Sequence, residues 1–357
     1  MSLVFNMVGG GGGGIKLASI AITTPPTKTS YLSGESFDPA GMVVEATYSN
    51  GATLIATGYA VEPSGPLSDG MTSVTIRYTE GGRSVTTTQA VTVTTISTTL
   101  NANSWATIKA VSDASKGASY WAVGDTKSIT INGKAGNFTF SNYTVDAFII
   151  GFNHNSSREG ANRIHFLIGK SGGKLVGLCD GSYNSSVSST GYFSMNSSST
   201  NSGGWNASQM RKTLLGNSGT PTSPTANTLL AALPSDLRAV MKSVTKYTDN
   251  TANGGGNTAS YVTATTDYLF ILAEFEVQGS CTYANSYEQN SQAQYDYFKA
   301  GNSKIAYRHT ATGTAVWWWF RSAYYDGDYF FCNVYTDGST DISAAFYSGG
   351  VMPGFAV

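Results

Sequence analysis

The side chains of this sequence that could act as nucleophiles or soft metal ligands are its three cysteines, Cys179, Cys281 and Cys332. They form no CxxC pair, and their odd number and wide spacing give no disulfide framework. An isolated cysteine of this kind usually behaves as a small apolar residue. We therefore expect the three to be buried residues rather than ligands or nucleophiles.

The three histidines are the candidates for general acid–base chemistry near neutral pH. His165 alternates with the apolar residues Ile164 and Phe166, which is typical of a structural position in a strand. His154 and His309 are scattered elsewhere along the chain. No HExxH, GxSxG or P-loop spacing occurs. The sequence therefore predicts no catalytic residue, no cofactor and no enzyme.

Four aspartates near the C-terminus carry oxygen ligands that would suit calcium: Asp326, Asp328, Asp337 and Asp341. Their spacing is not that of an EF-hand loop, and neither EPN nor QPD, the motifs of sugar-binding lectins, is present. We predict no metal ion here, and calcium is the alternative.

The same aspartates lie in a segment rich in Tyr, Ser and Gly, residues 323–348. Antibody binding loops use these residue types, because tyrosine offers a large contact area at low entropic cost. Two apolar blocks flank the segment, WWWFRS at 317–322 and GVMPGF at 350–355. We expect a ligand-binding face between two buried blocks. The predicted binding residues are Tyr324, Tyr325, Asp326, Asp328, Tyr329, Phe330, Tyr335, Asp337, Ser339, Asp341, Phe346 and Tyr347.

Particular positions of this tail carry specific expectations. Trp318 and Phe355 should be buried, and Arg321 should hold a carboxylate or backbone partner in bidentate fashion. Tyr324 and Asp341 should be exposed. The tyrosines and aspartates of the segment should form one face, which can then change without unfolding the domain.

Length and composition bound the class of protein. A chain of 357 residues is long enough for two domains. Charged residues make up only 12% and the net charge is −1, which gives no electrostatic footprint for nucleic acid or an anionic membrane. No apolar run is long enough to cross a bilayer. Abundant Ser, Thr, Asn and Gly fit extracellular and virion proteins better than a cytosolic enzyme.

The first sixteen residues predict a flexible anchor. A short apolar segment at 3–5 precedes six glycines at 9–14, and a glycine run works as a tether. An anchor that docks on another virion protein is one interpretation, and a disordered N-terminus is the other. The start lacks the cationic region of a secretory signal. Assembly into a phage particle inside the host would explain a surface protein without an export signal, as would a gene start without its leader.

Residues 17–95 predict a β-sandwich. A short strand at 20–23 and alternating strands at 41–48, 74–78 and 85–93 are separated by turn signals. The pattern LASIAITTPPTKTSYLSGESFDPAGMVVEATYSNG, followed by SVTIRYTEGG and AVTV, resembles the bacterial Ig-like repeats of group 3. That resemblance implies a spacer or stalk.

After a Thr/Ser linker at 96–100, residues 101–357 predict an α+β domain, because helical and strand patterns interleave irregularly. Helices are expected at 104–112 with Ser104 as N-cap, at 206–215, and at 229–244 with a break at Pro234 and a new cap at Ser235. Strands are expected at 128–131, before a turn at 132–133, and at 147–152, 164–169 and 267–277.

Several motifs of this region together resemble a large family of bacterial and phage domains. They are SWATIKAVSDASKGASYWAVGDTKSITING, GGWNASQMRKTLL, LPSDLRAVMKSVTKYT, LFILAEFEV, YDYF and WWWFRS…VMPGF. The family carries a WWLRS motif and a terminal PGF or PAF, and Phe320 here replaces the usual Leu. The resemblance implies a C-type-lectin fold, in the branch shared with formylglycine-generating enzymes and with the variable proteins of diversity-generating retroelements.

Membership of the retroelement branch would restrict which residue types occur in the variable segment. These elements mutate adenines, largely at Asn codons, and the resulting codons cannot encode Lys, Glu, Gln, Met or Trp. None of the five occurs in residues 323–348. The resemblance therefore implies a hypervariable binding segment. Enzymes of the formylglycine-generating branch use cysteines for oxygen chemistry or copper, and Cys281 and Cys332 lie outside any such motif.

These features predict a multidomain, non-enzymatic surface protein of a phage virion that binds a receptor. A bacterial cell-surface adhesin of the same architecture is the alternative, and a formylglycine-generating-type enzyme is a third, weaker one. The expected partners are a host cell-surface protein or glycan, other virion proteins through the N-terminus, and further copies of the chain, as in a trimer.

Overall fold

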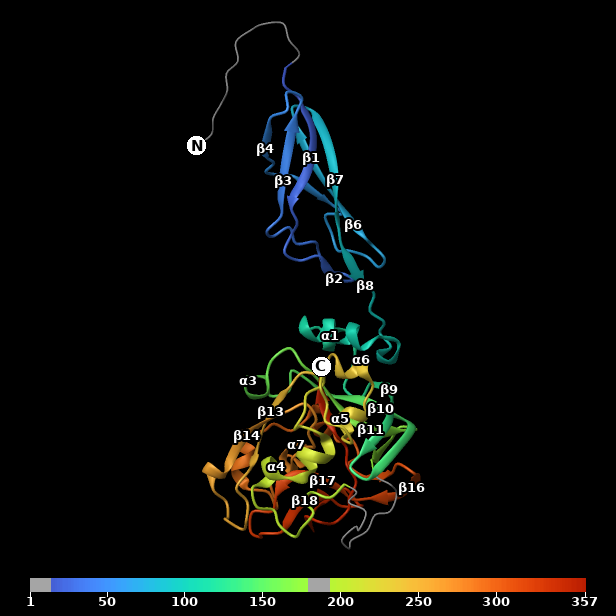
Figure 1. The fold of residues 1–357 in the computed structure, drawn as a ribbon, viewed down its shortest axis with the longest axis vertical. Coiled ribbons are helices and arrows are strands. Elements are labelled where there is room, and N and C mark those ends of the chain that lie inside the picture. Colours follow the sequence, from blue (N-terminus) through green and yellow to red (C-terminus); the bar gives the residue numbers. More distant parts are fainter. Residues whose placement is uncertain (1–13, 179–192) are drawn as a thin grey trace. The chain divides into compact units, whose positions relative to one another are not determined.

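The computed structural model describes residues 14–178 and 193–357, and the chain divides into two compact units, Met1–Ile96 and Ser97–Val357 (Figure 1). Most of the predicted anchor, residues 1–13, and Cys179 lie outside the described residues. Among the described residues, no helix has both the length and the apolar character that a bilayer crossing needs.

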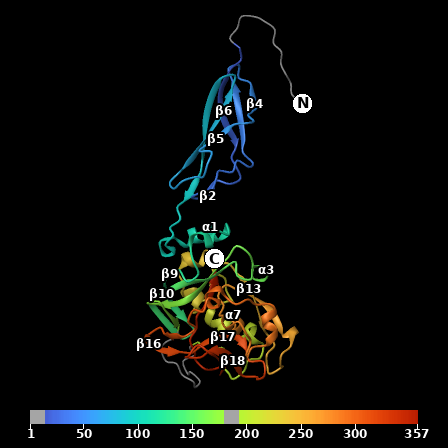
Figure 2. The ribbon, with the colours of Figure 1, turned by 180° about the vertical axis from the view of Figure 1, so that it is seen from behind.

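The first unit is built from two three-stranded antiparallel sheets. One contains β1 (Leu17–Thr24), β3 (Val43–Tyr48) and β4 (Thr53–Ile55), and the other contains β5 (Ala60–Glu62), β6 (Ser73–Glu80) and β7 (Arg83–Ala90). A parallel pair, β2 (Ser30–Leu32) and β8 (Thr92–Thr94), completes it. Figure 2 shows β5 and β6 from behind.

Alternation along these strands explains the core of the first unit. Val44 and Ala46 of one sheet and Val74 and Ile76 of the other are at most 1% exposed and belong to one apolar cluster. Successive side chains of a strand point to opposite faces, so every second residue is turned inward. The β-sandwich predicted for this region is therefore present.

A seven-stranded sheet organises the second unit. Its order is β16 (Ala311–Val316), β15 (Ala306–Arg308), β12 (Lys174–Gly177), β11 (Ile164–Ser171), β10 (Phe138–Phe152) and β9 (Thr126–Ala135), with β20 (Gly354–Ala356) also paired to β11. The chain end is thus held in the middle of the domain. Phe355 stacks on Phe166 at 5.1 Å between ring centroids, and Trp105 packs edge-on against both rings.

Two smaller sheets lie outside this one in the second unit. The pair β13 (Val244–Asp249) and β14 (Val262–Asp267) is antiparallel. The second is an antiparallel sheet of β17 (Trp318–Ala323), β18 (Phe330–Val334) and β19 (Thr340–Ala344). This last sheet carries the predicted binding segment.

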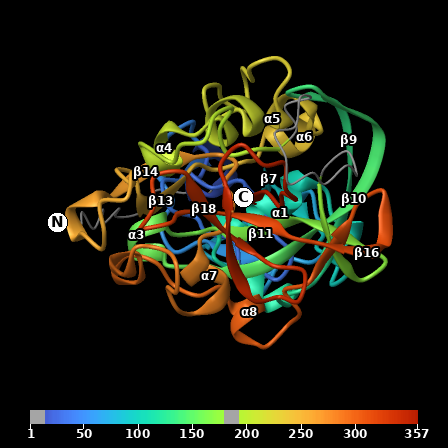
Figure 3. The same cartoon turned by 90° about the horizontal axis from the view of Figure 1, so that it is seen from below.

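The helices of the second unit are short apart from α1 (Trp105–Asp113), which confirms the first predicted helix. Ser104 caps it, because its Oγ accepts a hydrogen bond from the Thr107 amide at 3.0 Å. α5 (Leu229–Ala232) lies beside β9, and α6 (Ser235–Arg238) is close to α5 (Figure 3). The others are α2 (Gly117–Tyr120), α3 (Ser156–Glu159), α4 (Gly204–Ala207), α5 (Leu229–Ala232), α6 (Ser235–Arg238), α7 (Glu274–Gln278), α8 (Asp296–Lys299), the 3₁₀ turns η1 (Leu100–Ala102), η3 (Ala259–Tyr261) and η4 (Ser286–Asn290), and the π-helical turn η2 (Met210–Leu215).

Two predicted helices are shorter than expected. The one at 206–215 is replaced by α4 and η2. The one at 229–244 is replaced by α5 and α6, and Val244 already begins β13. Pro234, not Ser235, is the N-cap of α6, because its extended backbone ends α5 and opens the next turn.

Two other predictions were wrong. The expected strand at 267–277 is not one strand: β14 ends at Asp267, the chain bends at 268–269, Phe270 forms an isolated bridge with Gly354, and α7 begins at Glu274. An apolar run buried on every side has no periodicity that separates strand from helix. The turn expected at 132–133 lies inside β9, where Gly133 has a φ of +134°. The second unit is therefore richer in strand than the predicted α+β domain.

The predicted linker at 96–100 is mostly part of the second unit. The indole Nε1 of Trp121 donates to the Ser97 carbonyl at 3.0 Å, and the Asn103 side-chain amide donates to the same oxygen at 2.9 Å. Asn103 Oδ1 also accepts from the Ser97 amide. The boundary therefore falls between Ile96 and Ser97.

Candidate functional site

The base of the predicted binding segment is fully buried, as expected. Trp318, Trp319 and Arg321 of β17 are 0% exposed, and so is Phe355. Each buried indole has a partner for its N–H: Trp318 donates to the Lys304 carbonyl and Trp319 donates to the Phe193 carbonyl, both at 2.9 Å. Burying large rings with satisfied polar atoms anchors the start of the segment in the core.

Arg321 makes the bidentate contact that the sequence predicts. Its Nη1 and Nη2 donate to the two carboxylate oxygens of Glu276, on α7, at 2.5 and 2.8 Å. Its Nε donates to Thr248 Oγ1 at 2.7 Å, and Nη1 also donates to the Ile271 carbonyl at 3.0 Å. The guanidinium therefore connects β17 to α7, β13 and segment 268–273 in a buried environment.

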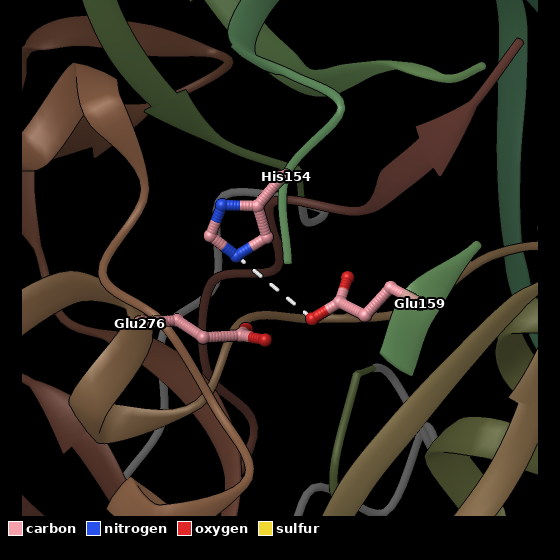
Figure 4. Close-up of side chains that lie close together, drawn as sticks. All are labelled: His154, Glu159 and Glu276. Atoms are coloured by element: carbon pink, nitrogen blue, oxygen red, sulfur yellow. Dashed lines mark ion pairs between the residues drawn. The ribbon is translucent and has the colours of Figure 1, made fainter. Parts of the chain in front are cut away.

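A cluster of buried acid and imidazole side chains lies next to this pair. Ligand atoms of His154, Glu159 and Glu276 lie within 4.8 Å of one another, and Figure 4 shows the three side chains pointing toward a common centre. Three such groups at this separation have the geometry of a metal site. However, the ammonium of Lys246 lies 2.7 Å from Glu159 Oε2 and 3.0 Å from Glu276 Oε1. Lys246 and Arg321 already compensate these carboxylates, so we interpret the cluster as a buried ion-pair network.

The charge states of the network follow from burial and from its two cations. Burial raises the pKa of Glu159 to about 7, although Lys246 acts against that shift. Burial would also raise the pKa of Glu276, but the charges of Arg321 and Lys246 outweigh it and hold that pKa well below the usual range. Burial, with the nearby Lys246 charge, lowers the pKa of His154 to about 3. The imidazole of His154 is therefore neutral near pH 7.

His165 is neutral for the same reason, because burial lowers the pKa of this imidazole well below its usual value. Its Nδ1 shares a hydrogen bond with the Tyr295 hydroxyl, 2.9 Å away, and that hydroxyl accepts from Lys246 at 2.8 Å. Its Nε2 has no hydrogen-bond partner among the described residues. His165 lies in a buried strand, as predicted.

Sequence reasoning missed this network almost entirely. Glu159, Lys246 and Glu276 are isolated charges in the sequence, and no motif links them. Their burial is the informative feature, since all three are at most 3% exposed. Lys246 lies between the two carboxylates, so removing any one of these groups would leave an uncompensated buried charge.

The structure does not bring the twelve predicted binding residues together in one place. Loop 324–330, which ends at the first residue of β18, lies at one end of the β17–β18–β19 sheet. Residues 345–347 lie at the same end, because Phe330 pairs with Ala344 and the Ala345 amide donates to the Tyr329 carbonyl. Loop 335–339 lies at the other end, where Val334 pairs with Thr340. Five residues of β18, at about 3.3 Å each, separate the ends by about 17 Å. The twelve residues therefore fall into two groups at opposite ends of the sheet, and a face common to both groups stays a prediction.

Exposure also differs from expectation at two positions. Tyr324 and Asp341 are half-buried, whereas they were expected to be exposed. The Tyr324 ring packs edge-on against the rings of Tyr283 and Tyr325, at 5.9 and 5.5 Å. The exposed members of the predicted set are Asp326, Asp328, Tyr329, Tyr335, Asp337 and Ser339, and the half-buried ones are Tyr324, Tyr325, Phe330, Asp341, Phe346 and Tyr347.

A buried asparagine outside the tail fixes the backbone of loop 324–330. The Nδ2 of Asn201 donates to the carbonyl oxygens of Gly327 at 2.6 Å, Phe330 at 2.9 Å and Tyr324 at 3.3 Å. The Asn201 backbone amide donates to the Asp328 carbonyl at 2.8 Å. Asn201 lies in the polar stretch NSSSTNSGG, which resembles an ordinary surface loop, so no sequence signal marks it. It is nevertheless 0% exposed.

The side chains of the same loop are not used to hold it. Among the described residues, Asp326, Asp328 and Tyr329 have no side-chain hydrogen-bond or ion-pair partner. Loop 324–330 thus has a backbone that its neighbours determine and exposed side chains that are free to contact a ligand.

The two described cysteines show no sign of reactivity. Cys332 is fully buried in β18, as expected, and Cys281 is only half-buried. Burial, with the nearby Glu288 and Glu274 carboxylates, raises the pKa of both thiols. A thiol is a poor nucleophile and a poor ligand until it loses its proton.

The first unit has a groove of its own. It has a volume of about 990 Å³ and is lined by Leu17, Leu54, Glu80 and Arg83, among others. Leu54 is 63% exposed beside it. Nothing in the structure indicates what covers this groove.

Comparison with known families separates the two units. Residues 24–93 match the bacterial Ig-like domain (group 3). The first unit is a bacterial Ig-like domain. Residues 186–357 match a domain of unknown function (DUF6273), a region that includes Asn201 and the β17–β19 sheet. No curated protein matches the chain. The Ig-like resemblance inferred from the sequence is confirmed, and the second match carries neither a lectin-fold nor a retroelement assignment.

Proposed function

We propose that the second unit is a non-enzymatic ligand-binding module on the surface of a phage virion, with the Ig-like domain as its spacer. The ligand is a molecule of the host cell surface, and loop 324–330 contacts it. The second unit is proposed to have a C-type-lectin-like fold, on the strength of the motifs from SWATIKAV to VMPGF.

The observation that carries this proposal is the way loop 324–330 is held. All four Asn201 contacts to the loop reach main-chain carbonyls, and the Gly256 amide adds a fifth, to the Tyr325 carbonyl at 3.0 Å. A loop fixed through its main chain keeps its shape when its side chains are replaced. It is also preorganised, which lowers the entropic cost of binding.

The same observation supports a segment that tolerates variation. Substitution of the exposed side chains of Asp326, Asp328 or Tyr329 removes no hydrogen bond to a described residue. Substitution of Trp318 or Arg321, which are buried, would remove such bonds. The absence of Lys, Glu, Gln, Met and Trp from residues 323–348 fits diversification by a retroelement. We propose that this diversification is concentrated at the 324–330 end of the sheet.

A bacterial cell-surface adhesin is the second candidate. It is favoured by the match of residues 24–93 to a domain family named for bacteria. Both candidates use the same binding loop, so they differ in the particle that carries the protein and not in the contact surface.

The test is binding of the fluorescently labelled full chain to a panel of bacterial strains, measured by flow cytometry. Tyr329→Ala should abolish binding, because aromatic anchors of interfaces contribute about 2 kcal/mol or more each. Tyr335→Ala is the matched control, since Tyr335 and Tyr329 are 46% and 42% exposed at opposite ends of one sheet.

Three results of this experiment would each contradict the proposal: no strain is bound, Tyr329→Ala binds as well as the unaltered chain, or both variants lose binding equally. Protease and periodate treatment of the cells distinguishes a protein ligand from a glycan. Electron microscopy with antibodies against the chain, on phage particles and on cells, separates the virion protein from the adhesin.

A further inference from the structure

We infer that the binding surface is composite: residues 253–258 and 281–287 form a second half beside loop 324–330, and together they fit a basic patch on a partner protein. This inference rests on the proposed function and adds residues that the sequence did not indicate.

The three segments are joined directly. The Tyr325 amide donates to the Tyr283 carbonyl at 3.1 Å, and Tyr324 forms an isolated β-bridge with Ala284. On the other side, the Gly256 amide donates to the Tyr325 carbonyl at 3.0 Å. Loop 324–330 is therefore inserted between two loops from earlier in the chain, and a ligand that contacts it also meets them.

The two flanking segments are fixed to each other and to Asn201. The Ser286 amide donates to Asn257 Oδ1 at 2.7 Å, and the Asn253 amide donates to Asn201 Oδ1 at 2.9 Å. Gly254 neighbours Gly327, since a Cβ on it would make an ordinary contact of 3.6 Å with the Gly327 carbonyl carbon, and its φ of +67° favours glycine. The same asparagine thus positions both halves of the surface.

The exposed side chains of the flanking segments are of the kind found in binding loops. Tyr287 is 42% exposed, which equals the exposure of Tyr329. Asn253 and Asn257 are exposed as well. Exposed tyrosines on a rigid backbone, accompanied by asparagine, are typical of protein-binding loops.

The charge of the composite surface indicates its partner. Asp326 and Asp328 are exposed, and no Lys or Arg occurs in residues 251–258, 281–290 or 323–330. Neither carboxylate is paired with a described residue. Carboxylates bind guanidinium groups strongly, and tyrosine rings attract cations over their faces. A protein surface with Lys or Arg side chains is complementary to this combination.

The probe is a random 12-residue peptide library, selected on the immobilised full chain, with the affinities of enriched peptides measured by fluorescence anisotropy. Enriched peptides should carry net positive charge and should bind more weakly as salt is added. Tyr287→Ala, and the double variant Asp326→Asn with Asp328→Asn, should each weaken binding at least about tenfold. Tyr335→Ala should leave it unchanged.

The outcomes separate this inference from the proposed function. If Tyr329→Ala abolishes cell binding and Tyr287→Ala does not, loop 324–330 alone is the site and the composite surface is wrong. If enriched peptides are neutral or acidic, or if no peptide is enriched, the basic partner is wrong. The melting temperature of each variant is compared with that of the unaltered chain, and a loss of binding is interpreted only for variants that are folded.

Discussion

The side-chain nitrogen of Asn201 lies 2.6 Å from the carbonyl oxygen of Gly327, and this contact links a polar stretch near the middle of the chain to the exposed loop of its C-terminal tail. The same nitrogen serves two further carbonyls, so one amide group coordinates the main chain across seven residues. The shape of loop 324–330 therefore depends on a residue that no ligand needs to touch.

We expect Asn201→Ala to loosen loop 324–330 without unfolding the second unit. Buried carbonyls that lose their donor cost about 1–3 kcal/mol, and the cost here is local. Amide hydrogen exchange across residues 324–330 should accelerate at least about tenfold, while exchange in β10 and β11 should stay unchanged. Asn290→Ala, at an exposed asparagine, is the control. Unchanged exchange in the loop would show that Asn201 does not position it.

The ion pair of Glu276 with Arg321 should be far more sensitive to substitution than any exposed charge of this chain. Glu276→Gln leaves Lys246 and Arg321 buried with too little negative charge, and breaking one partner of a buried pair costs about 3–5 kcal/mol. The free energy of urea unfolding should fall by that amount. Asp337→Asn, at an exposed carboxylate, should change it by less than about 0.5 kcal/mol. Similar losses in both variants would contradict a buried ion-pair network.

Glu159 should give the stability of the second unit a measurable pH dependence. Its pKa is raised from 4.5 to about 7 in the fold, so the folded state holds the proton more tightly than the unfolded chain. That contribution is complete below about pH 4.5 and is lost as the pH rises through about 7. The pKa of His154 is lowered to about 3 in the fold, so the unfolded chain takes up this proton first. His154 therefore lowers the stability as the pH falls below 6.5.

The measurement is the free energy of unfolding between pH 4.5 and 8 for the unaltered chain and for Glu159→Gln. The variant should lose a downward slope of at most about 1.4 kcal/mol per pH unit, which is the value for one proton. Glu288 also has a pKa raised to about 7 by burial, so part of the slope should remain. A profile identical to that of the unaltered chain would show that Glu159 does not titrate in this range.

The features that were predicted correctly depend on a short stretch of sequence, whereas features that depend on contacts between distant segments were not predicted. The Ser104 cap, the alternating strands of the Ig-like domain, the buried Trp318 and the bidentate Arg321 follow from residue type and spacing, and the structure has all of them. The division of the predicted binding residues into two groups did not follow from the sequence, because it needed the register of β18, which places Tyr329 and Tyr335 at opposite ends. Hairpin geometry of this kind depends on pairing between strands and not on composition.

The missed residues share a different cause. Asn201, Glu159 and Lys246 are polar, and polar residues in short polar stretches are usually exposed. Their burial follows only from tertiary contacts between segments that lie far apart in the sequence, 87 residues in the case of Glu159 and Lys246. No pattern along one stretch of chain encodes such a pair.

The sharpest contrast in stability should lie between Trp318 and Asp328, one in the buried base of the tail and one on its exposed loop. Trp318→Ala removes a ring that is 0% exposed and deprives the Lys304 carbonyl of its donor, and truncating a core tryptophan costs about 3–5 kcal/mol. We expect insoluble protein, or soluble protein whose near-ultraviolet circular dichroism is lost.

Asp328→Ser removes an exposed carboxylate that has no partner in the described part of the chain. It leaves the contact of Asn201 with the Asp328 main chain in place. Its melting temperature should stay within about 2 °C of the unaltered chain. Related chains should show the same contrast: differences should concentrate at residues 324–330 and spare Trp318, Arg321 and Asn201. If Asp328→Ser destabilises the fold as much as Trp318→Ala, or if variation is even along the second unit, the loop is part of the folded scaffold and not a surface open to change.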